Sequence, residues 1–564
     1  MKNMTSQSWK QVANISLLGG LITVLIALIG MVEAFSRRFI ISGVISMGQV
    51  FLLLPIFIFS FINIRKAGGT TKSTQLLIGA ITGLLGGVVV FILLFAGQLV
   101  NLRAMLINAS PALYEIITFG VGFPIGYFIP LLVYLIVGVA GAGIYILAPR
   151  WRKAIIQGLL VVLLVGLLRD LINTVIALWG PLTVVFKWLF AISGLTVIGA
   201  IVIFVLISGL TFWQAGRPKR AAKVVVTKRD KTIRYSMYGG IAVLILFLPQ
   251  ILGIFFSEVL DTVGLYILMG LGLNIVVGFA GLLDLGYVAF YAIGAYVMGV
   301  LTSPGLGFFD LTFWEALPFA LVASVLAGLI LGLPVLKTRG DYLAIVTLGF
   351  GEIVRLLALS DWLGPYLGGT QGIQSIAQPR IGPIVLDNQA DLYYLILVGI
   401  LIALFIAWRL KDSHVGRSWM ALREDEDVAQ AMGINTMATK LMAFATGAFF
   451  SGLAGAIFAA KLQSAYPHSF NFLVSINVLA LIIIGGMGSI PGVIVGALVM
   501  VGVPELLREF AEFRLLAYGA ILVAMMLIRP EGILPEARRK LELHEEEPIV
   551  EIEENTTSPS AAGD

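Results

Sequence analysis

The sequence predicts an all-α polytopic integral membrane protein, and two observations carry this prediction. The chain of 564 residues is 59% hydrophobic and only 12% charged, with a mean hydropathy of +1.00. A water-soluble protein of this length needs a polar outer layer and could not hide so much apolar surface. Many uncharged runs also reach roughly 18 residues or more, which is enough to cross about 30 Å of hydrocarbon as a helix.

Composition excludes several classes of function. The absence of cysteine rules out disulfides, thiolate metal sites and cysteine nucleophiles. The three histidines, His414, His468 and His544, are scattered, so we predict no metal site. The net charge of +5 is spread over many short loops, which is typical of membrane topology signals and not of nucleic-acid binding. The abundant glycine, 63 residues, suits close packing of membrane helices.

The apolar runs in the first part of the chain predict a bundle of about six spans. The fourth segment is too long for one straight helix, and Pro124 and Pro130 predict a kink, a break or two segments there. We interpret this part, residues 1–213, as an accessory N-terminal bundle. The predicted spans are approximately 15–34, 40–63, 75–98, 113–148, 154–176 and 182–213.

A basic linker, residues 214–235, separates this bundle from a second region of about ten spans. This region, residues 236–528, brings the total to about 16 transmembrane segments. The acid-rich tail, residues 529–564, is predicted to be disordered. The spans of the second region are approximately 236–256, 262–281, 283–303, 314–336, 342–358, 391–409, 441–462, 472–488, 490–506 and 514–528.

Basic residues in short loops predict the orientation. The linker 214–235, the block 409–440 and the tail 529–564 are all expected on the cytoplasmic side. Six spans lie between the first pair and four between the second, so the three assignments agree in parity.

The block between two of these spans carries five consecutive charges, Arg423, Glu424, Asp425, Glu426 and Asp427. Apolar residues flank the charges near helical spacing, which predicts one or two short amphipathic helices across the cytoplasmic face. Gly433 suits the end of the second helix. The block is either a solvated connection or a docking element for a soluble partner. The flanking apolar residues are Val415, Trp419, Leu422, Ala429 and Met432.

Several collinear motifs resemble the LivM-type permease of branched-chain amino acid ABC importers. "EDEDVAQAMGIN" is similar to the cytoplasmic coupling-helix motif of ABC importer permeases, and "IRPEGIL" at 528–534 to the usual ending of the family. The resemblance covers approximately residues 236–540 and leaves the first 214 residues unmatched. The further matching stretches are "GLNIVVGFAGLLDLGYVAFYAIGAYVMGVL" (272–301), "LKTRGDYLAIVTLGFGEIVRLL" (336–357), "LGGTQGI" (367–373), "ALREDEDVAQAMGIN" (421–435) and "IIIGGMGSIPGVIVGA" (482–497).

The resemblance implies a set of partners in the cell (inner or plasma) membrane. These are a second related permease, two cytoplasmic ABC ATPase subunits and an extracytoplasmic substrate-binding protein. The chain contains no G-x-x-x-x-G-K-[ST] motif, so we expect ATP to be used by the partners and no cofactor to be bound here. The predicted function is the permease subunit of an amino-acid importer, with no catalytic residues. Urea or short amides remain open as substrates, and a self-sufficient secondary transporter or channel is the alternative.

Within this framework the coupling loop would comprise Trp419, Leu422, Arg423–Asp427, Ala429, Met432 and Gly433, with Trp419, Leu422 and Met432 as its apolar anchor in the partner. Gly433 would allow close approach or chain reversal.

Ionisable residues inside spans are costly and are therefore candidates for a translocation path. Asp284 lies at a glycine-rich junction, where it could line a path or cap a helix that starts at Leu285. Glu352 and Arg355 lie three residues apart on one helix, where they can form an ion pair. Tyr287, Phe290 and Tyr291 are either path aromatics or packing residues. The glycine-rich stretches around residues 278–296 and 485–502 resemble each other, which suits broken helices and an inverted repeat.

Overall fold

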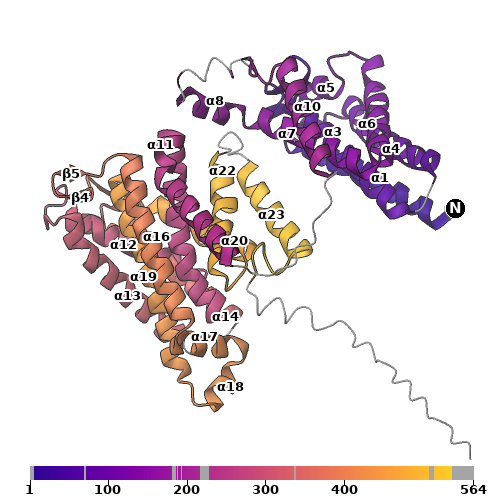
Figure 1. Cartoon of the computed structure of the whole chain (residues 1–564). Coiled ribbons are helices and arrows are strands. Elements are labelled where there is room, and N and C mark those ends of the chain that lie inside the picture. Colours follow the sequence, from indigo (N-terminus) through magenta and orange to yellow (C-terminus); the bar gives the residue numbers. More distant parts are fainter. Residues whose placement is uncertain are drawn as a thin grey trace, which may run out of the picture. The chain divides into compact units, whose positions relative to one another are not determined.

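The computed structural model divides the chain into two compact units, Met1–Arg234 and Tyr235–Asp564 (Figure 1). We call them unit 1 and unit 2. The structure describes residues 6–68, 71–178, 193–215, 228–335, 340–506 and 513–535, together with positions 180, 186, 188–191 and 338. Much of the basic linker and residues 536–564 of the predicted acidic tail therefore lie outside the described residues.

Unit 1 is built from apolar helices with short connections. Ser46 begins α3 with a capping box, in which its side chain accepts from the Gln49 N–H and Gln49 accepts from the Ser46 N–H. A two-stranded antiparallel pair precedes that helix, formed by β1 (Phe39–Ile41) and β2 (Ile45–Ser46). The helices are α1 (Ser6–Leu28), α2 (Met31–Ala34), α3 (Met47–Ala67), α4 (Lys72–Leu99), α5 (Pro111–Ile117), α6 (Ile129–Ile146), α7 (Pro149–Leu167), α8 (Arg169–Leu178) and α10 (Val197–Ala215).

Close packing and a buried polar cluster hold unit 1 together. Gly83 of α4 lies against the backbone of α6 with no room for a Cβ atom. The Asn63 amide of α3 donates to the hydroxyls of Ser16 (3.1 Å) and Thr82 (2.9 Å), which lie on α1 and α4. Small residues that let backbones approach, together with interhelical hydrogen bonds, are the usual way in which helices associate where no water drives them together.

Unit 2 contains the helices from α11 onward, together with short strands. Its strands form two antiparallel pairs, β3 (Ile373–Gln374) with β6 (Ser464–Ala465), and β4 (Arg380–Ile381) with β5 (Ile384–Val385). The helices are α11 (Lys228–Leu273), η3 (Asn274–Phe279, a π-helical turn), α12 (Val288–Thr302), α13 (Phe313–Val335), α14 (Asp341–Leu359), α15 (Gly364–Leu367), α16 (Gln389–Lys411), α17 (His414–Glu424), α18 (Glu426–Ala431), α19 (Thr436–Leu462), α20 (Phe472–Gly485), α21 (Ile490–Ala497), η6 (Leu498–Gly502, π-helical), α22 (Val503–Leu506) and α23 (Arg514–Ile528).

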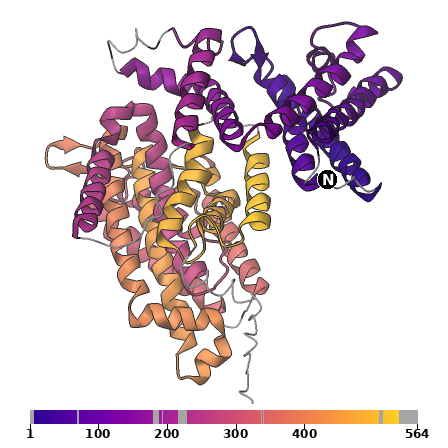
Figure 2. The same ribbon diagram turned by 45° about the vertical axis from the view of Figure 1, so that its right-hand side comes forward.

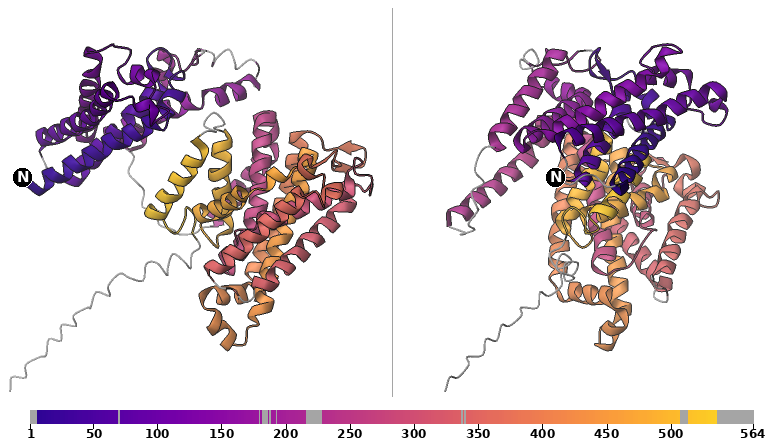
Figure 3. Two further views of the ribbon diagram at one scale, coloured as in Figure 1. Left: turned by 180° about the vertical axis from the view of Figure 1, so that it is seen from behind. Right: turned by 90° about the vertical axis from the view of Figure 1, so that its right-hand side faces the viewer.

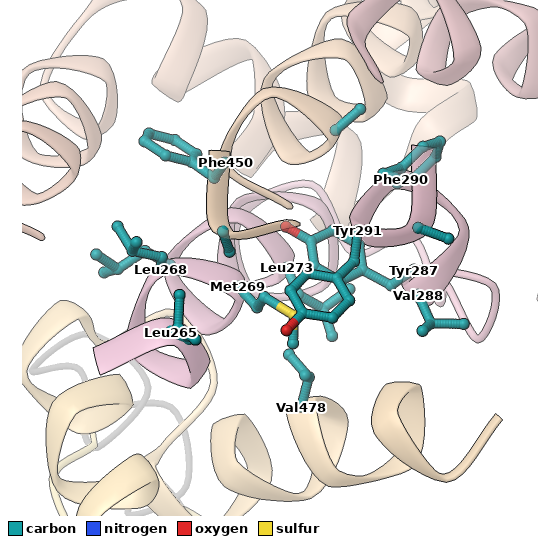
Figure 4. Close-up of a cluster of buried hydrophobic side chains, with 14 of the residues drawn as sticks. Leu265, Leu268, Met269, Leu273, Tyr287, Val288, Phe290, Tyr291, Phe450 and Val478 are labelled. Carbon is teal, nitrogen blue, oxygen red and sulfur yellow. The ribbon is translucent and has the colours of Figure 1, made fainter. Parts of the chain in front are cut away.

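The core of unit 2 lies where α12, α13 and α19 pack against each other and against α11 (Figure 2). Gly294 of α12 and Gly452 of α19 meet backbone to backbone, which leaves no room for a Cβ atom on Gly294. Figure 4 shows Leu268 and Leu273 of α11, Tyr291 of α12, Phe450 of α19 and Val478 of α20 gathered in one buried cluster. This rigid centre positions the short elements at both ends of the unit.

The two ends of unit 2 differ in structure. The short helices α17 and α18 form one end, and the β4–β5 hairpin lies at the opposite end (Figures 1 and 3). α17 and α18 therefore lie at the end of unit 2 that is opposite the hairpin.

The all-α membrane fold is confirmed, but the predicted count of about 16 spans is not. Ten of the described helices are long and apolar enough to cross a membrane, or up to twelve if each of two sharply bent pairs forms one span. The helices α20 and α21 with their continuations form one such pair, bent by 119°, and α7 with α8 the other, bent by 71°. Hydropathy alone counts apolar runs and cannot detect that two of them meet at a sharp bend.

Several predicted boundaries also change. The predicted spans 236–256 and 262–281 correspond to two helices within α11 that meet at a kink at Gly253, whose φ is 81°, so the break lies earlier in the chain than predicted. The polar residues of the predicted connection, Ser257, Glu258 and Asp261, lie within the second of these helices, and the glycine marks the actual break. In the predicted segment 113–148 the chain forms α5, then an irregular stretch, then α6. Residues 529–535, predicted as part of the disordered tail, pack onto unit 2, where the Ile533 and Leu534 N–H groups donate to the carbonyls of Ile484 and Gly485.

Candidate functional site

The charged block folds as two short helices, α17 and α18, that meet within the run of five charges. Ser413 begins α17, where its hydroxyl accepts from the Gly416 N–H at 3.3 Å. Asp425 adopts an extended conformation that ends α17, and its carboxylate accepts from the N–H groups of Asp427 and Val428, both at 2.9 Å. A carboxylate at this position satisfies N–H groups that the first turn leaves unpaired. The charged run therefore encodes the break between the helices.

One face of α17 is fixed to the body of unit 2. Trp419 is fully buried, and its indole N–H donates to the Thr439 carbonyl at the start of α19 (3.0 Å). Leu422, one turn further along, is 5% exposed. These two side chains were expected to anchor a partner, but the structure buries both within this chain. The sequence could not distinguish burial against a partner from burial within the chain, because an apolar helix face has the same residue pattern in both cases.

The helix α18 is attached through a charge pair and presents apolar residues outward. The Lys440 ammonium of α19 lies 2.7 Å from a Glu426 carboxylate oxygen, and its side chain is only 3% exposed. Ala429 faces inward, whereas Val428 is 58% exposed and Met432 is 80% exposed. Val428 of α18 and Met432, which directly follows the helix, are thus exposed apolar side chains. We call Val428, Met432 and the exposed acidic side chain of Glu424 the outer face of the charged block.

Gly433 reverses the chain after α18. Its φ of 88° lies in the left-handed region that side chains disfavour, and no atom lies within 4 Å of the position that a Cβ atom would occupy. Gly433 was expected to allow either close approach or chain reversal, and the structure of this chain explains the chain reversal.

Arg423 connects the charged block to the interior of unit 2. One guanidinium N–H donates to the Gly278 carbonyl (2.8 Å) in the π-helical turn η3, and another lies 3.2 Å from the Glu424 carboxylate. A Cβ atom on Gly281, whose φ is 71°, would approach the Arg423 side chain to 2.6 Å. The lack of a side chain at Gly281 therefore leaves room for the Arg423 side chain to reach η3.

The same π-helical turn also holds the bent pair of helices α20 and α21. The Asn274 side-chain oxygen is buried and accepts from the Gly488 N–H at 2.9 Å. Gly488 lies in the turn between the two helices, and Ser489 then caps α21 by accepting from the Gly492 N–H at 3.1 Å. π-Helical turns are rare and occur frequently at functional sites. η3 thus contacts both the charged block and the sharpest bend in the chain.

Among the candidates for a translocation path, four are buried. Asp284 is fully buried and accepts from the Gly286 N–H at 2.9 Å. The following helix begins at Val288 and not at Leu285, so Asp284 forms a local turn and is not its cap. The Tyr287 hydroxyl donates to the Gly447 carbonyl (2.7 Å). Phe290 and Tyr291 lie in the cluster of Figure 4.

Glu352 and Arg355 lie apart from this cluster. They form the expected ion pair on α14, with about 41% of the Glu352 side chain exposed. Glu352 also lines a cavity of about 150 Å³ together with Leu285 and Val288, which flank the start of α12. The structure therefore brings one candidate acid, Glu352, to an open space near α12, whereas Asp284 does not line that cavity.

Sequence reasoning missed three residues that organise the site. Asn274, Lys440 and Gly488 join the charged block, η3 and the bent pair α20–α21. A polar Asn inside an otherwise apolar run is a signal that could have revealed the first, because an amide in a membrane span requires a partner. The partner itself lies 214 residues along the chain and could not be inferred from local pattern.

Comparison with known proteins identifies the family of the chain. Residues 255–529 match the family described as branched-chain amino acid transport system / permease component. The chain is 41% identical over 302 residues to the high-affinity branched-chain amino acid transport system permease protein LivM of Salmonella typhimurium, which covers 50% of this chain and 70% of the relative. LivM of Escherichia coli K12 is 40% identical over 302 residues, which again cover 50% of this chain and 70% of the relative. The permease LivH of Salmonella typhimurium is 24% identical over 49% of this chain and 93% of its own length. No solved structure matches the chain.

The apolar helices and these matches define a multi-pass membrane protein of the transport-permease class. Within that class, the chain belongs to the family of permease components of branched-chain amino acid transport systems.

Proposed function

We propose that this chain is a transmembrane permease subunit of an ABC importer that carries branched-chain or related amino acids. It would pair with a second, LivH-like permease and receive substrate from an external binding protein. Two cytoplasmic ATPase subunits would hydrolyse the ATP, which fits a chain that contains no phosphate-binding loop.

The path from the charged block to the interior is the observation that carries this proposal. A motor outside the membrane can move the spans only through a contact at their cytoplasmic end. Here α18 offers Val428 and Met432 outward, while Arg423 holds the Gly278 carbonyl of η3 on the inner side. Asn274 then extends this connection to Gly488. A displacement of the outer face would therefore reach the bend between α20 and α21 through hydrogen bonds and packed backbone.

We place the translocation path along the exposed face of α14. Glu352 and Arg355 would contribute charge to it, and the cavity beside Leu285 and Val288 would be its side wall. Asp284, Tyr287, Phe290 and Tyr291 would support that wall from the interior, since all four are buried.

We also propose that residues 1–213 form an accessory bundle beside the transport machinery. The family match begins only at residue 255, and unit 1 has hydrophobic clusters of its own. These clusters consist of residues of unit 1 alone.

The test of the coupling proposal replaces Met432 by Glu in the complete importer. Fully burying a side chain of this size contributes about 1.5–3 kcal/mol, so loss of that burial predicts an ATPase affinity roughly tenfold to hundredfold weaker. Met105→Glu is the matched control, because Met105 is also 80% exposed but lies in unit 1. ATPase co-purification and uptake of radiolabelled leucine into proteoliposomes are measured. Normal values for Met432→Glu would show that the charged block is only a solvated connection.

A further inference from the structure

A cavity of about 1000 Å³ opens beside the charged block, between the end of α16, α17 and the start of α21. Its wall is mainly apolar, and it carries two basic residues and one acidic residue, Lys411, Arg417 and Asp412. The apolar part includes Phe405, Trp408 and Ile490. A cavity with an apolar wall and a basic margin suits an amphiphile with a negative head group better than a free anion or an acidic peptide.

An exposed apolar stripe on α16 leads into this cavity. Val398, Leu401, Phe405 and Trp408 follow helical spacing along one face, and each is more than half exposed. Ten residues of helix span about 15 Å, which is half the thickness of the hydrocarbon core. The stripe therefore has the length of one leaflet and ends in a tryptophan, the residue that favours the boundary between hydrocarbon and water.

The basic residues lie just beyond that tryptophan. Lys411 is one helical turn further along α16, and its ammonium lies 5.8 Å from the centre of the Phe279 ring. Arg417 lies in the first half of α17 and donates one N–H to the Asp412 carbonyl at 3.2 Å. A guanidinium has five N–H donors, so further donors remain for a phosphate. Since they follow an apolar stripe of one leaflet's length, both cations are expected at the depth of the phospholipid head groups.

We propose that this cavity binds an anionic phospholipid of the leaflet next to α17. The acyl chains would lie along the stripe from Val398 to Phe405, and the phosphate would contact Lys411 and Arg417. Basic pockets between membrane helices recognise anionic head groups in this manner. Because α17 and α21 both border the cavity, the lipid would contact the charged block and the bent pair at once.

The test measures lipid binding to the full-length chain in detergent by native mass spectrometry, with palmitoyl-oleoyl phosphatidylglycerol and phosphatidylcholine as probes. Each basic residue near an anionic head group contributes about fivefold to affinity. The variant with Lys411→Gln and Arg417→Gln is therefore expected to bind phosphatidylglycerol about 30-fold more weakly. The control, Arg409→Gln with Arg103→Gln, removes the same charge from exposed positions outside the cavity and is expected to bind normally.

A second measurement identifies what covers the site in the complete importer. A photoreactive amino acid in place of Phe405 is expected to cross-link to phosphatidylglycerol in membranes. Cross-linking to the paired permease instead would overturn the proposal, and so would equal binding of the two lipids or an equal loss in the control variant.

Discussion

Replacing Arg423 by Gln tests whether the contact of Arg423 with η3 transmits motion of the charged block to the interior. The arginine donates to the buried Gly278 carbonyl at 2.8 Å, and its side chain is 26% exposed. A hydrogen bond of this charged kind contributes about 1.5–3 kcal/mol. A loss of about 2 kcal/mol shifts the balance between the attached and detached states by roughly 30-fold. We therefore expect the outer face to keep its ATPase contact while losing its hold on η3.

The assay compares ATP hydrolysis with amino-acid uptake in the same proteoliposomes. Arg423→Gln is expected to retain hydrolysis and to lower the uptake per ATP about tenfold or more. Glu424→Gln is the matched control, because it keeps the arginine and removes only a surface pair, which contributes about 0–1 kcal/mol. The 65% exposure of the Glu424 side chain supports that small value. An unchanged ratio of uptake to hydrolysis in Arg423→Gln would refute the reasoning.

The remaining predictions concern chain reversal, orientation and the accessory bundle. Gly433→Val is expected to lower uptake, because a β-branched residue in the left-handed region costs at least about 1–2 kcal/mol. Gly433→Asn is expected to cost less, and comparable uptake by both variants would contradict this. Single cysteines placed in 214–235, 409–440 or 529–564 are expected to resist an impermeant thiol reagent applied outside; for 529–564 this requires that the bent pair α20–α21 crosses the membrane twice or re-enters on one side, and labelling of the tail alone would show that the pair forms one span. A chain shortened to begin near Lys231 is expected to assemble and transport; loss of uptake in a stably inserted form would make unit 1 part of the machine.

Local pattern predicted the helical elements of the site well. The spacing of Trp419, Leu422 and Ala429 predicted short amphipathic helices, and α17 and α18 are present. Amphipathicity is a property of a few consecutive residues, so it can be read without knowledge of the rest of the chain. The motif resemblance to LivM-type permeases was likewise carried by short collinear stretches, and the family comparison confirms it.

The number of spans could not be predicted in the same way. Hydropathy treated α20 and α21 as two crossings, whereas they are bent by 119° and form either one broken span or a re-entrant loop. The break itself was visible as a glycine-rich stretch. Its angle depends on contacts from elsewhere, including the Asn274 hydrogen bond to Gly488 and the return of Ile533 onto Ile484.

The sequence by itself determined that this is an all-α membrane protein of the permease family. Both the apolar character of each run and the short family motifs can be recognised from neighbouring residues alone. Only the tertiary structure decided which apolar side chains remain for a partner. Trp419 and Leu422 are used internally and Met432 is not, although all three fit one amphipathic pattern. Burial depends on which surface arrives from α19, and that surface is set by the packing of the whole unit. The contact between Arg423 and Gly278 joins residues 145 positions apart for the same reason.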